Sequence, residues 1–283
     1  MAVSVPLLTF VDPRALAADN EIYDAKEALR GLRTGVTSNP TLVLSEAIRV
    51  SESAQAHNPF NPAAYQLLAH AKMRERDLLL EIGAKDTKDI EVIEGIVLQA
   101  LQNAVTLRPL SAPLQDELTT AHLAFWRTAN KGTKPSDFAR AKAAEHLRQA
   151  ADHARRAYEL YPTSSYTAYK LACILELNRD AEAPRYFKEA LRLSDLAGKE
   201  LEDLGRLKLS TLSRAHATRS LGRALEAFEI LDRHLRATIQ GAPADQARRW
   251  LERYLKNAQQ DELDDRMVPV LKDVVDAIIR DLK

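Results

Sequence analysis

The side chains in this 283-residue chain that most often carry chemistry are seven histidines and one cysteine. His146 and His153 share one face of a predicted helix but lie two turns apart, too far to ligate one metal ion together. The single Cys173 excludes an intrachain disulfide and a thiolate zinc site. There is no glycine-rich phosphate loop, no Gly-x-Ser-x-Gly turn and no Cys–His pairing in the sequence. We therefore predict no catalytic residues, no metal and no cofactor.

One short segment, residues 35–43, offers an enzymatic alternative. It reads Gly-Val-Thr-Ser-Asn-Pro-Thr-Leu-Val and resembles the N-terminal signature of transaldolases, with Asp12 at a suitable distance upstream. That resemblance implies a (β/α)₈ barrel and a Schiff-base lysine on a later strand. Residues 60–283 offer helices without strands between them, so the barrel is not expected. A cap from residues 37–39 followed by Pro40 explains the same segment as the start of a helix.

The charge balance and the hydropathy pattern exclude several classes of partner. Forty basic and forty acidic residues give a formal net charge of zero, which predicts neither nucleic-acid binding nor attraction to an anionic membrane. No apolar run approaches the ~18 residues that span a bilayer. The apolar stretch from Val3 to Val11 predicts a short extended strap rather than a signal peptide. We expect a soluble, cytoplasmic protein, or an extracytoplasmic one if the chain is a piece of a membrane protein.

Apolar residues recur at helical spacing almost throughout the chain, which predicts an all-α protein. The first helix includes Leu16 and Leu32 and ends near Gly31 or Gly35. Eleven more helices are expected at about 40–57, 61–82, 88–107, 112–130, 138–160, 164–178, 182–194, 199–219, 223–239, 243–259 and 268–282. Twelve helices would make six antiparallel pairs.

A three-part pattern recurs along these helices. An alanine lies five residues before a proline, and a leucine followed by a small residue lies nine and ten residues after it. The three instances are Ala54–Pro59–Leu68–Ala69, Ala104–Pro109–Leu118–Thr119 and Ala157–Pro162–Leu171–Ala172. The proline ends one helix and precedes the next, and the small residues allow close packing. A helix–proline–helix pattern at regular spacing indicates a stacked helical repeat.

The clearest copy of this repeat resembles a tetratricopeptide (TPR) repeat, in a divergent form. Its helix A and helix B carry the small and aromatic residues of that family at Ala168, Leu171, Ala172, Ala183, Phe187 and Ala190. Successive prolines are 50 and 53 residues apart, whereas a TPR unit has about 34 residues. The resemblance implies antiparallel helix pairs stacked as a right-handed superhelix, an α-solenoid. A generic helical bundle is the alternative.

The predicted organisation has three parts in one continuous superhelix. Residues 1–36 form the strap and first helix, 37–240 form the repeats with an insertion loop near 130–137, and 241–283 form C-terminal capping helices. The last helix has an apolar stripe of Leu271, Val274, Val275, Ile278, Ile279 and Leu282. We expect this stripe to dock as a cap on the pair at 223–259, covering Leu251, Tyr254 or Leu255. Pairing with a second copy in a homodimer is the alternative to a monomer.

The TPR resemblance also implies where a partner would bind. In such repeats the A helices line a concave groove. Placing that rule on this sequence gives Gln66, His70, Met73, Asp116, Thr120, Leu123, Tyr169, Cys173 and Glu176. This mixed set fits a peptide or helix of a protein partner. The expected function is a non-enzymatic protein–protein interaction scaffold or adaptor.

A second class of function stays open. The phrases Leu-Arg-Pro-Leu-Ser and Leu-Tyr-Pro-Thr-Ser are similar to soluble TPR-like regions attached to bacterial membrane glycan polymerases and ligases. That resemblance implies an accessory domain outside the cytoplasm. A transaldolase-like aldolase is the minor alternative.

Overall fold

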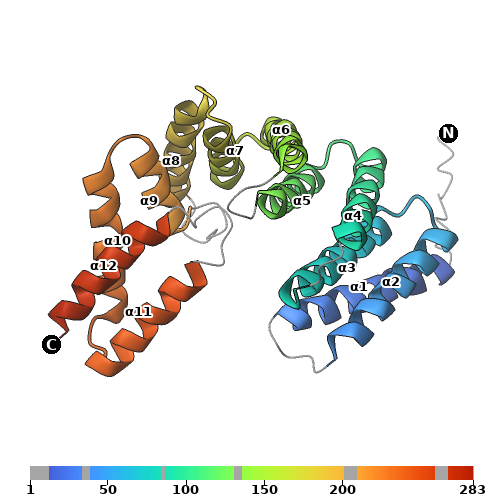
Figure 1. Ribbon diagram of the computed structural model, residues 1–283, viewed down its shortest axis with the longest axis horizontal. Coiled ribbons are helices and arrows are strands. Elements are labelled where there is room, and N and C mark those ends of the chain that lie inside the picture. The colour runs from blue at the N-terminus through green and yellow to red at the C-terminus, as the bar shows by residue number, and fades with distance from the viewer. Residues whose placement is uncertain are drawn as a thin grey trace, which may run out of the picture. The chain divides into compact units, whose positions relative to one another are not determined.

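The computed structural model describes residues 13–33, 39–83, 87–130, 136–200, 209–258 and 267–282. In these residues every regular element is a helix, and there is no strand (Figure 1). The helices are α1 Pro13–Arg33, α2 Pro40–His57, α3 Pro62–Glu81, α4 Thr87–Leu107, α5 Ala112–Ala129, α6 Asp137–Leu160, α7 Ser165–Leu177, α8 Ala183–Glu200, α9 Thr211–Ser220, α10 Ala224–Ile239, α11 Ala244–Ala258 and α12 Val268–Asp281. The predicted all-α chain of helix pairs is confirmed.

Two predicted boundaries were wrong, both around α8 and α9. We expected helices at 182–194 and 199–219, but α8 continues to Glu200 and α9 begins only at Thr211. The helix runs through Gly198, because one glycine costs a helix interior only about 1 kcal/mol. The start of α9 follows from Ser210, whose side chain accepts a hydrogen bond from the Ser213 N–H at 3.0 Å.

The start of α2 bears on the transaldolase alternative. The Asn39 side chain accepts a hydrogen bond from the Leu42 N–H at 3.2 Å, and Pro40 occupies the first turn. This is the capping arrangement that the sequence predicts. Because the described residues contain no strand, the barrel that a transaldolase needs has no counterpart in them.

The repeated proline pattern produces the same turn three times. The residue before each proline donates its N–H to the carbonyl of the repeat alanine: Asn58 to Ala54 at 2.8 Å, Arg108 to Ala104 at 3.1 Å and Tyr161 to Ala157 at 3.0 Å. The same residue then accepts from the N–H three positions on: Asn61 to Asn58 at 3.1 Å, Ser111 to Arg108 at 3.1 Å and Ser164 to Tyr161 at 3.3 Å. Proline is the second residue of each turn, where its fixed φ is favourable. The sequence repeat is therefore a structural repeat.

The chain forms two compact units, Met1–Ala121 and His122–Lys283, and their boundary falls within α5. In the first unit, α1, α2 and α3 enclose a core that includes Ile22, Val50 and Leu67, and α4 packs on α3. The predicted strap and residues 131–135 of the predicted insertion loop lie outside the described residues. The three-part division by residue number stays a prediction.

In the second unit, α7 packs on both α6 and α8, and their shared core includes Phe187. Ala183, Phe187 and Ala190, which the TPR resemblance places on one face of helix B, are at most 4% exposed. A wholly buried Phe187 between small residues is the close helix packing that this pattern predicts. The TPR-like character of this repeat is thus present in its packing.

One helix is more apolar than the sequence analysis expected. Within α4, Lys88–Leu107 has a mean hydropathy of 1.2 and is long and apolar enough, by length and composition alone, to cross a membrane. In this structure 44% of that stretch is buried in the protein, and α4 packs on α3. Its buried side chains include Val97, Leu101 and Ala104.

The C-terminal stripe docks on its own chain, as predicted. Leu271, Val274, Val275 and Ile278 are at most 1% exposed and share a core with Leu231, Leu235 and Leu251. Helix α12 contacts both α10 and α11, and Arg236 forms an ion pair with Asp281 at 2.7 Å. The stripe is therefore covered and is not a free face for a homodimer.

Removing this cap should damage the second unit. Deletion of residues 268–283 would expose the fully buried Leu231, Leu235 and Leu251, each of which gains about 1.5–3 kcal/mol from burial. We expect a lower thermal midpoint and aggregation of the truncated chain, measured by circular dichroism and light scattering. A truncated chain that stays monomeric with an unchanged midpoint would contradict the cap.

Candidate functional site

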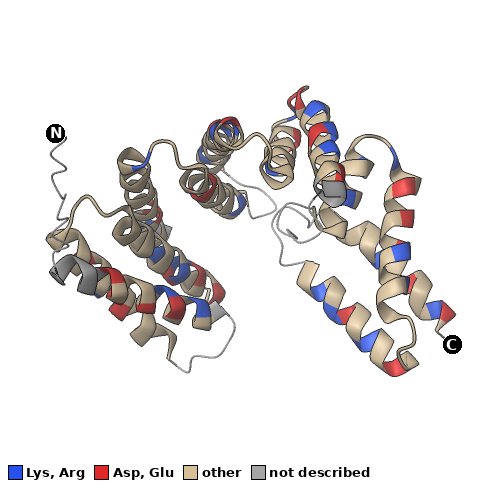
Figure 2. Cartoon of the chain, turned by 180° about the vertical axis from the view of Figure 1, so that it is seen from behind, with Lys and Arg blue, Asp and Glu red and all other residues tan. Residues whose placement is uncertain are grey.

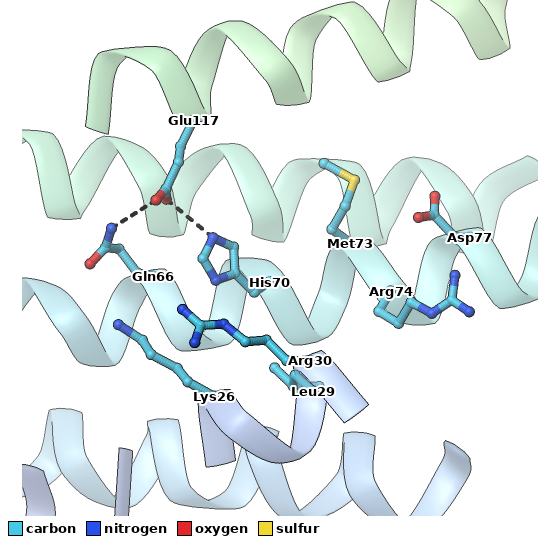
Figure 3. A pocket seen from close by; sticks show the side chains of 9 residues that line it. All are labelled: Lys26, Leu29, Arg30, Gln66, His70, Met73, Arg74, Asp77 and Glu117. Atoms are coloured by element: carbon cyan, nitrogen blue, oxygen red, sulfur yellow. Dashed lines mark hydrogen bonds and ion pairs between the residues drawn. The ribbon is translucent and has the colours of Figure 1, made fainter. Parts of the chain in front are cut away.

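The first helices of three successive pairs, α1, α3 and α5, line an open groove with a volume of about 600 Å³ (Figure 3). Its lining residues are Lys26, Leu29, Arg30, Gln66, His70, Met73, Arg74, Asp77 and Glu117. Three of these, Gln66, His70 and Met73, are residues that the sequence analysis placed in the partner-binding groove. The whole groove belongs to the first unit.

Glu117 of α5 lies between two side chains of α3. The Gln66 amide donates a hydrogen bond to Glu117 Oε1 at 2.9 Å, and His70 Nε2 lies 3.3 Å from Glu117 Oε2. Both contacts join residues that are about fifty positions apart, and Figure 3 shows the carboxylate pointing down toward them. A carboxylate oriented by an amide and an imidazole is a fixed acceptor with further lone pairs available.

Burial inside the groove shifts the pKa of two charged groups. It lowers the pKa of Lys26, against the opposing effect of Glu117, and nearby Arg30 lowers it further. It also raises the pKa of Asp77, against the opposing effects of Arg76 and Arg74. In both residues, loss of hydration disfavours the charged form. Hydrogen bonds made here are electrostatically stronger than on an open surface.

The rest of the groove combines cations with apolar side chains. Arg30 pairs with Glu27 at 2.6 Å, and Arg74 pairs more loosely with Glu81 at 3.4 Å. The half-buried Leu29 and Met73 lie between these polar groups along the groove. Such a surface offers hydrogen bonds, an apolar contact and charge within one short stretch.

The other predicted site residues do not line this groove. Asp116 is half-buried and Thr120 is exposed, and the Thr120 hydroxyl donates to the Asp116 carbonyl at 2.9 Å. The prediction of partner-binding residues was wrong for Leu123, Tyr169 and Cys173. These side chains are 4%, 1% and 2% exposed and belong to the core of the second unit. A partner at the surface cannot contact these three side chains.

The reason for this error is that α7 is buried on nearly every side. Every residue from Ala168 to Leu175 is buried, because α6 and α8 cover this helix and the Tyr169 side chain reaches His216 of α9. A helix that is apolar all round is a core helix. The sequence does indicate this burial, since Lys170 is the only charged residue between Ala168 and Leu175.

Tyr169, Cys173 and Glu176 meet around His216, a contact that sequence reasoning missed. The Tyr169 hydroxyl lies 2.9 Å from His216 Nδ1, and Cys173 Sγ lies 3.8 Å from the same atom. Glu176 Oε2 lies 3.4 Å from His216 Nε2. Since a carboxylate only accepts, His216 Nε2–H is the donor to Glu176. This buried network ties α7 to α9.

Three histidines meet between α5 and α6. His122 Nδ1 lies 3.1 Å from His146 Nδ1, and its ring stacks on that of His153 with centroids 5.6 Å apart. Burial, together with these two neighbours, lowers the pKa of His122 to about 3. Within the described ranges no group of three or more His, Cys, Asp or Glu side chains is arranged to hold a metal ion. The three rings contribute to the packing of α5 on α6.

Comparisons with known proteins show likeness only at the level of the fold. No family model matches the chain, and no curated protein matches it. TTC0263, a thermophilic TPR protein of Thermus thermophilus, is 19% identical, with a TM-score of 0.44 over 77% of this chain and 92% of that one. MamA is 15% identical, with a TM-score of 0.38 over 71% and 88%.

A third solved structure is that of IFIT1, a monomeric mutant with Gppp-AAAA. It is 15% identical, with a TM-score of 0.46 over 92% of this chain and 55% of that one.

The fold class of the present chain follows from its own helix pairs and repeated turns. Its fold is an all-α repeat of helix pairs with a TPR-like arrangement.

Proposed function

We propose that this chain is a non-enzymatic scaffold that binds a segment of a partner protein in the groove of α1, α3 and α5. The observation that carries the proposal is Glu117, held by Gln66 and His70 in the middle of a set of first helices. A peptide main chain presents one donor and one acceptor per residue. Glu117 can accept from a peptide N–H, and Lys26 can donate to a peptide carbonyl.

The length of the groove suits a short peptide. Gln66 and Asp77 are eleven positions apart on one helix, which corresponds to roughly 16 Å at 1.5 Å per residue. An extended peptide of about five residues spans that length. Met73 and Leu29 would contact an apolar side chain of the segment, and Arg30 and Arg74 would pair with an acidic one.

This proposal keeps the protein partner that the sequence analysis expected and narrows the site. The binding residues become Lys26, Arg30, Gln66, His70, Met73 and Glu117, in place of the nine predicted residues. The groove offers no feature specific to a glycan polymerase or ligase, so the accessory-domain alternative stays a prediction. A cytoplasmic location, likewise, stays a prediction.

The groove residues should be required for capture of the partner. We expect the double variant Gln66→Ala/His70→Ala to lose capture of a native partner by about tenfold, because it removes two groove side chains together with the Gln66 hydrogen bond and the His70 contact that orient Glu117. The measurement is affinity capture from native lysate followed by quantitative mass spectrometry. A photoreactive residue at Met73 should crosslink to the captured protein.

The matched control is Gln102→Ala/His57→Ala. It removes the same two residue types from α4 and α2, where both side chains are exposed and outside the groove. The control should capture the partner as the unchanged protein does. Equal capture by all three proteins, or crosslinks from position 73 to nothing that is captured, would refute the groove as the binding site.

A further inference from the structure

A second groove lies on α6 and α8, which are second helices of their pairs, in the second unit. It has a volume of about 550 Å³ and is lined by Tyr158, Arg185, Tyr186, Lys188, Glu189 and Arg192. None of these residues belongs to the groove proposed above. Lys and Arg alternate with Asp and Glu along most helices of the chain (Figure 2), so a groove with an excess of one sign is a local feature.

Two tyrosines form the apolar part of this groove. Their rings meet edge to face with centroids 5.4 Å apart, and the Arg185 guanidinium lies over the Tyr186 ring at 5.5 Å. These contacts fix the orientation of both rings. Burial, Glu189 and Tyr186 raise the pKa of Tyr158, so its hydroxyl stays protonated and can donate a hydrogen bond.

The charges around the tyrosines favour an anion. Three cations line the groove against one carboxylate. That carboxylate, Glu189, is already occupied, since Arg192 donates to both of its oxygens at 2.6 and 2.8 Å. Arg185 has only a weak contact of 3.7 Å with Glu182. Lys188 is exposed, and in the described part of the chain it forms no ion pair.

We propose that this groove binds an acidic segment of a protein. Carboxylates of the segment pair with Lys188 and Arg185, and the Tyr158 hydroxyl donates to a further acceptor. The alternative of single-stranded nucleic acid is disfavoured, because Arg185 already covers one face of Tyr186 and so leaves fewer aromatic faces for base stacking. The second groove does not depend on the first, and together they would let one chain hold two segments.

The test uses the full chain and three labelled probes: octaglutamate, octalysine and octathymidylate. We expect octaglutamate to bind in fluorescence anisotropy at low salt, more tightly than the other two, and to weaken as salt rises. Lys188→Gln should weaken octaglutamate binding about fivefold, and Lys188→Gln/Arg185→Gln should weaken it further. Tyr158→Phe should weaken it about threefold while keeping the ring packing.

Two controls isolate the groove. Lys256→Gln removes the same charge from an exposed lysine of α11 in the same unit and should leave binding unchanged. Lys188→Gln should leave the crosslink from position 73 in the first groove unchanged, which separates this inference from the proposed function. Equal weakening by Lys188→Gln and Lys256→Gln would overturn the proposal by showing general charge attraction. Tighter binding of octathymidylate, lost in Lys188→Gln, would overturn it in favour of nucleic acid.

Discussion

Replacing Glu94 with glutamine should lower the free energy of unfolding of the first unit by about 3–5 kcal/mol. Glu94 Oε1 accepts from Arg76 Nε at 3.0 Å, and the two side chains are 7% and 3% exposed. The variant would leave the guanidinium of α3 buried with a neutral partner from α4. Asp77 also contacts Arg76, at 3.2 Å, but it is more exposed and compensates only in part. Urea unfolding followed by circular dichroism measures the loss.

Comparison with an exposed ion pair tests whether burial causes the loss of stability in Glu94→Gln. Glu46→Gln breaks the ion pair with Arg49 in α2 at 2.6 Å, where both side chains are more than half exposed, and should change the free energy of unfolding far less, because water solvates both charges. Replacing the buried pair together, as Arg76→Met/Glu94→Leu, should recover most of the stability lost in Glu94→Gln, because an apolar pair needs no compensation. Similar losses for Glu94→Gln and Glu46→Gln would contradict this account.

Acidification should destabilise the second unit through His122. Its pKa falls from 6.5 to about 3 in the folded chain, first because of burial and then because of His146 and His153. Below pH 6.5 the unfolded chain therefore takes up a proton that the folded chain does not. The contribution of His122 to the free energy of unfolding is fully present above pH 6.5 and is lost as the pH falls toward about 3. From pH 7 to pH 4 the loss is about 3 kcal/mol.

The comparison of two variants isolates this group from the carboxylates that also titrate. His122→Gln should lose about 3 kcal/mol less than the unchanged protein between pH 7 and pH 4, in urea unfolding at each pH. His57→Gln, which replaces an exposed histidine at the end of α2, should follow the unchanged protein. If the free energy of unfolding depends on pH in the same way for His122→Gln and His57→Gln, the histidine cluster does not cause the loss of stability in acid.

The repeat could be predicted from the sequence because its determinants are local. Each proline, with the alanine five residues before it, specifies a helix end and a turn through hydrogen bonds that span three or four residues. The apolar stripe of α12 was equally informative, because one stripe needs one covering surface. The predicted α8–α9 boundary was wrong because the apolar periodicity does not mark where α8 ends, whereas the side-chain cap at Ser210 does mark where α9 begins.

The candidate site could be predicted only in part, because it depends on which helices meet. Gln66, His70 and Met73 followed from their spacing relative to Leu68 and Ala69. Lys26 and Arg30 were missed since α1 carries no copy of the repeat pattern. For α5 the prediction named Asp116 instead of its neighbour Glu117. The positions expected to face the groove in α3 had been transferred to α5, and the rotation of α5 differs by one residue. A groove across three helices depends on the rotation of each helix about its axis, which spacing along one helix does not specify.

The order in which helices meet has a consequence for the folding of the chain. Most helices pack on the next helix in sequence, as α1 does on α2, α3 on α4, and α7 on α8. Contacts of this kind close short loops, which keeps the entropic cost low and makes folding fast. Each pair can therefore assemble while the chain is being synthesised. Helix α12 also packs on α10, across α11, as α1 packs on α3 across α2. Because α12 follows α10 and α11 in the chain, the core that the three helices share is completed only after α12 has been made.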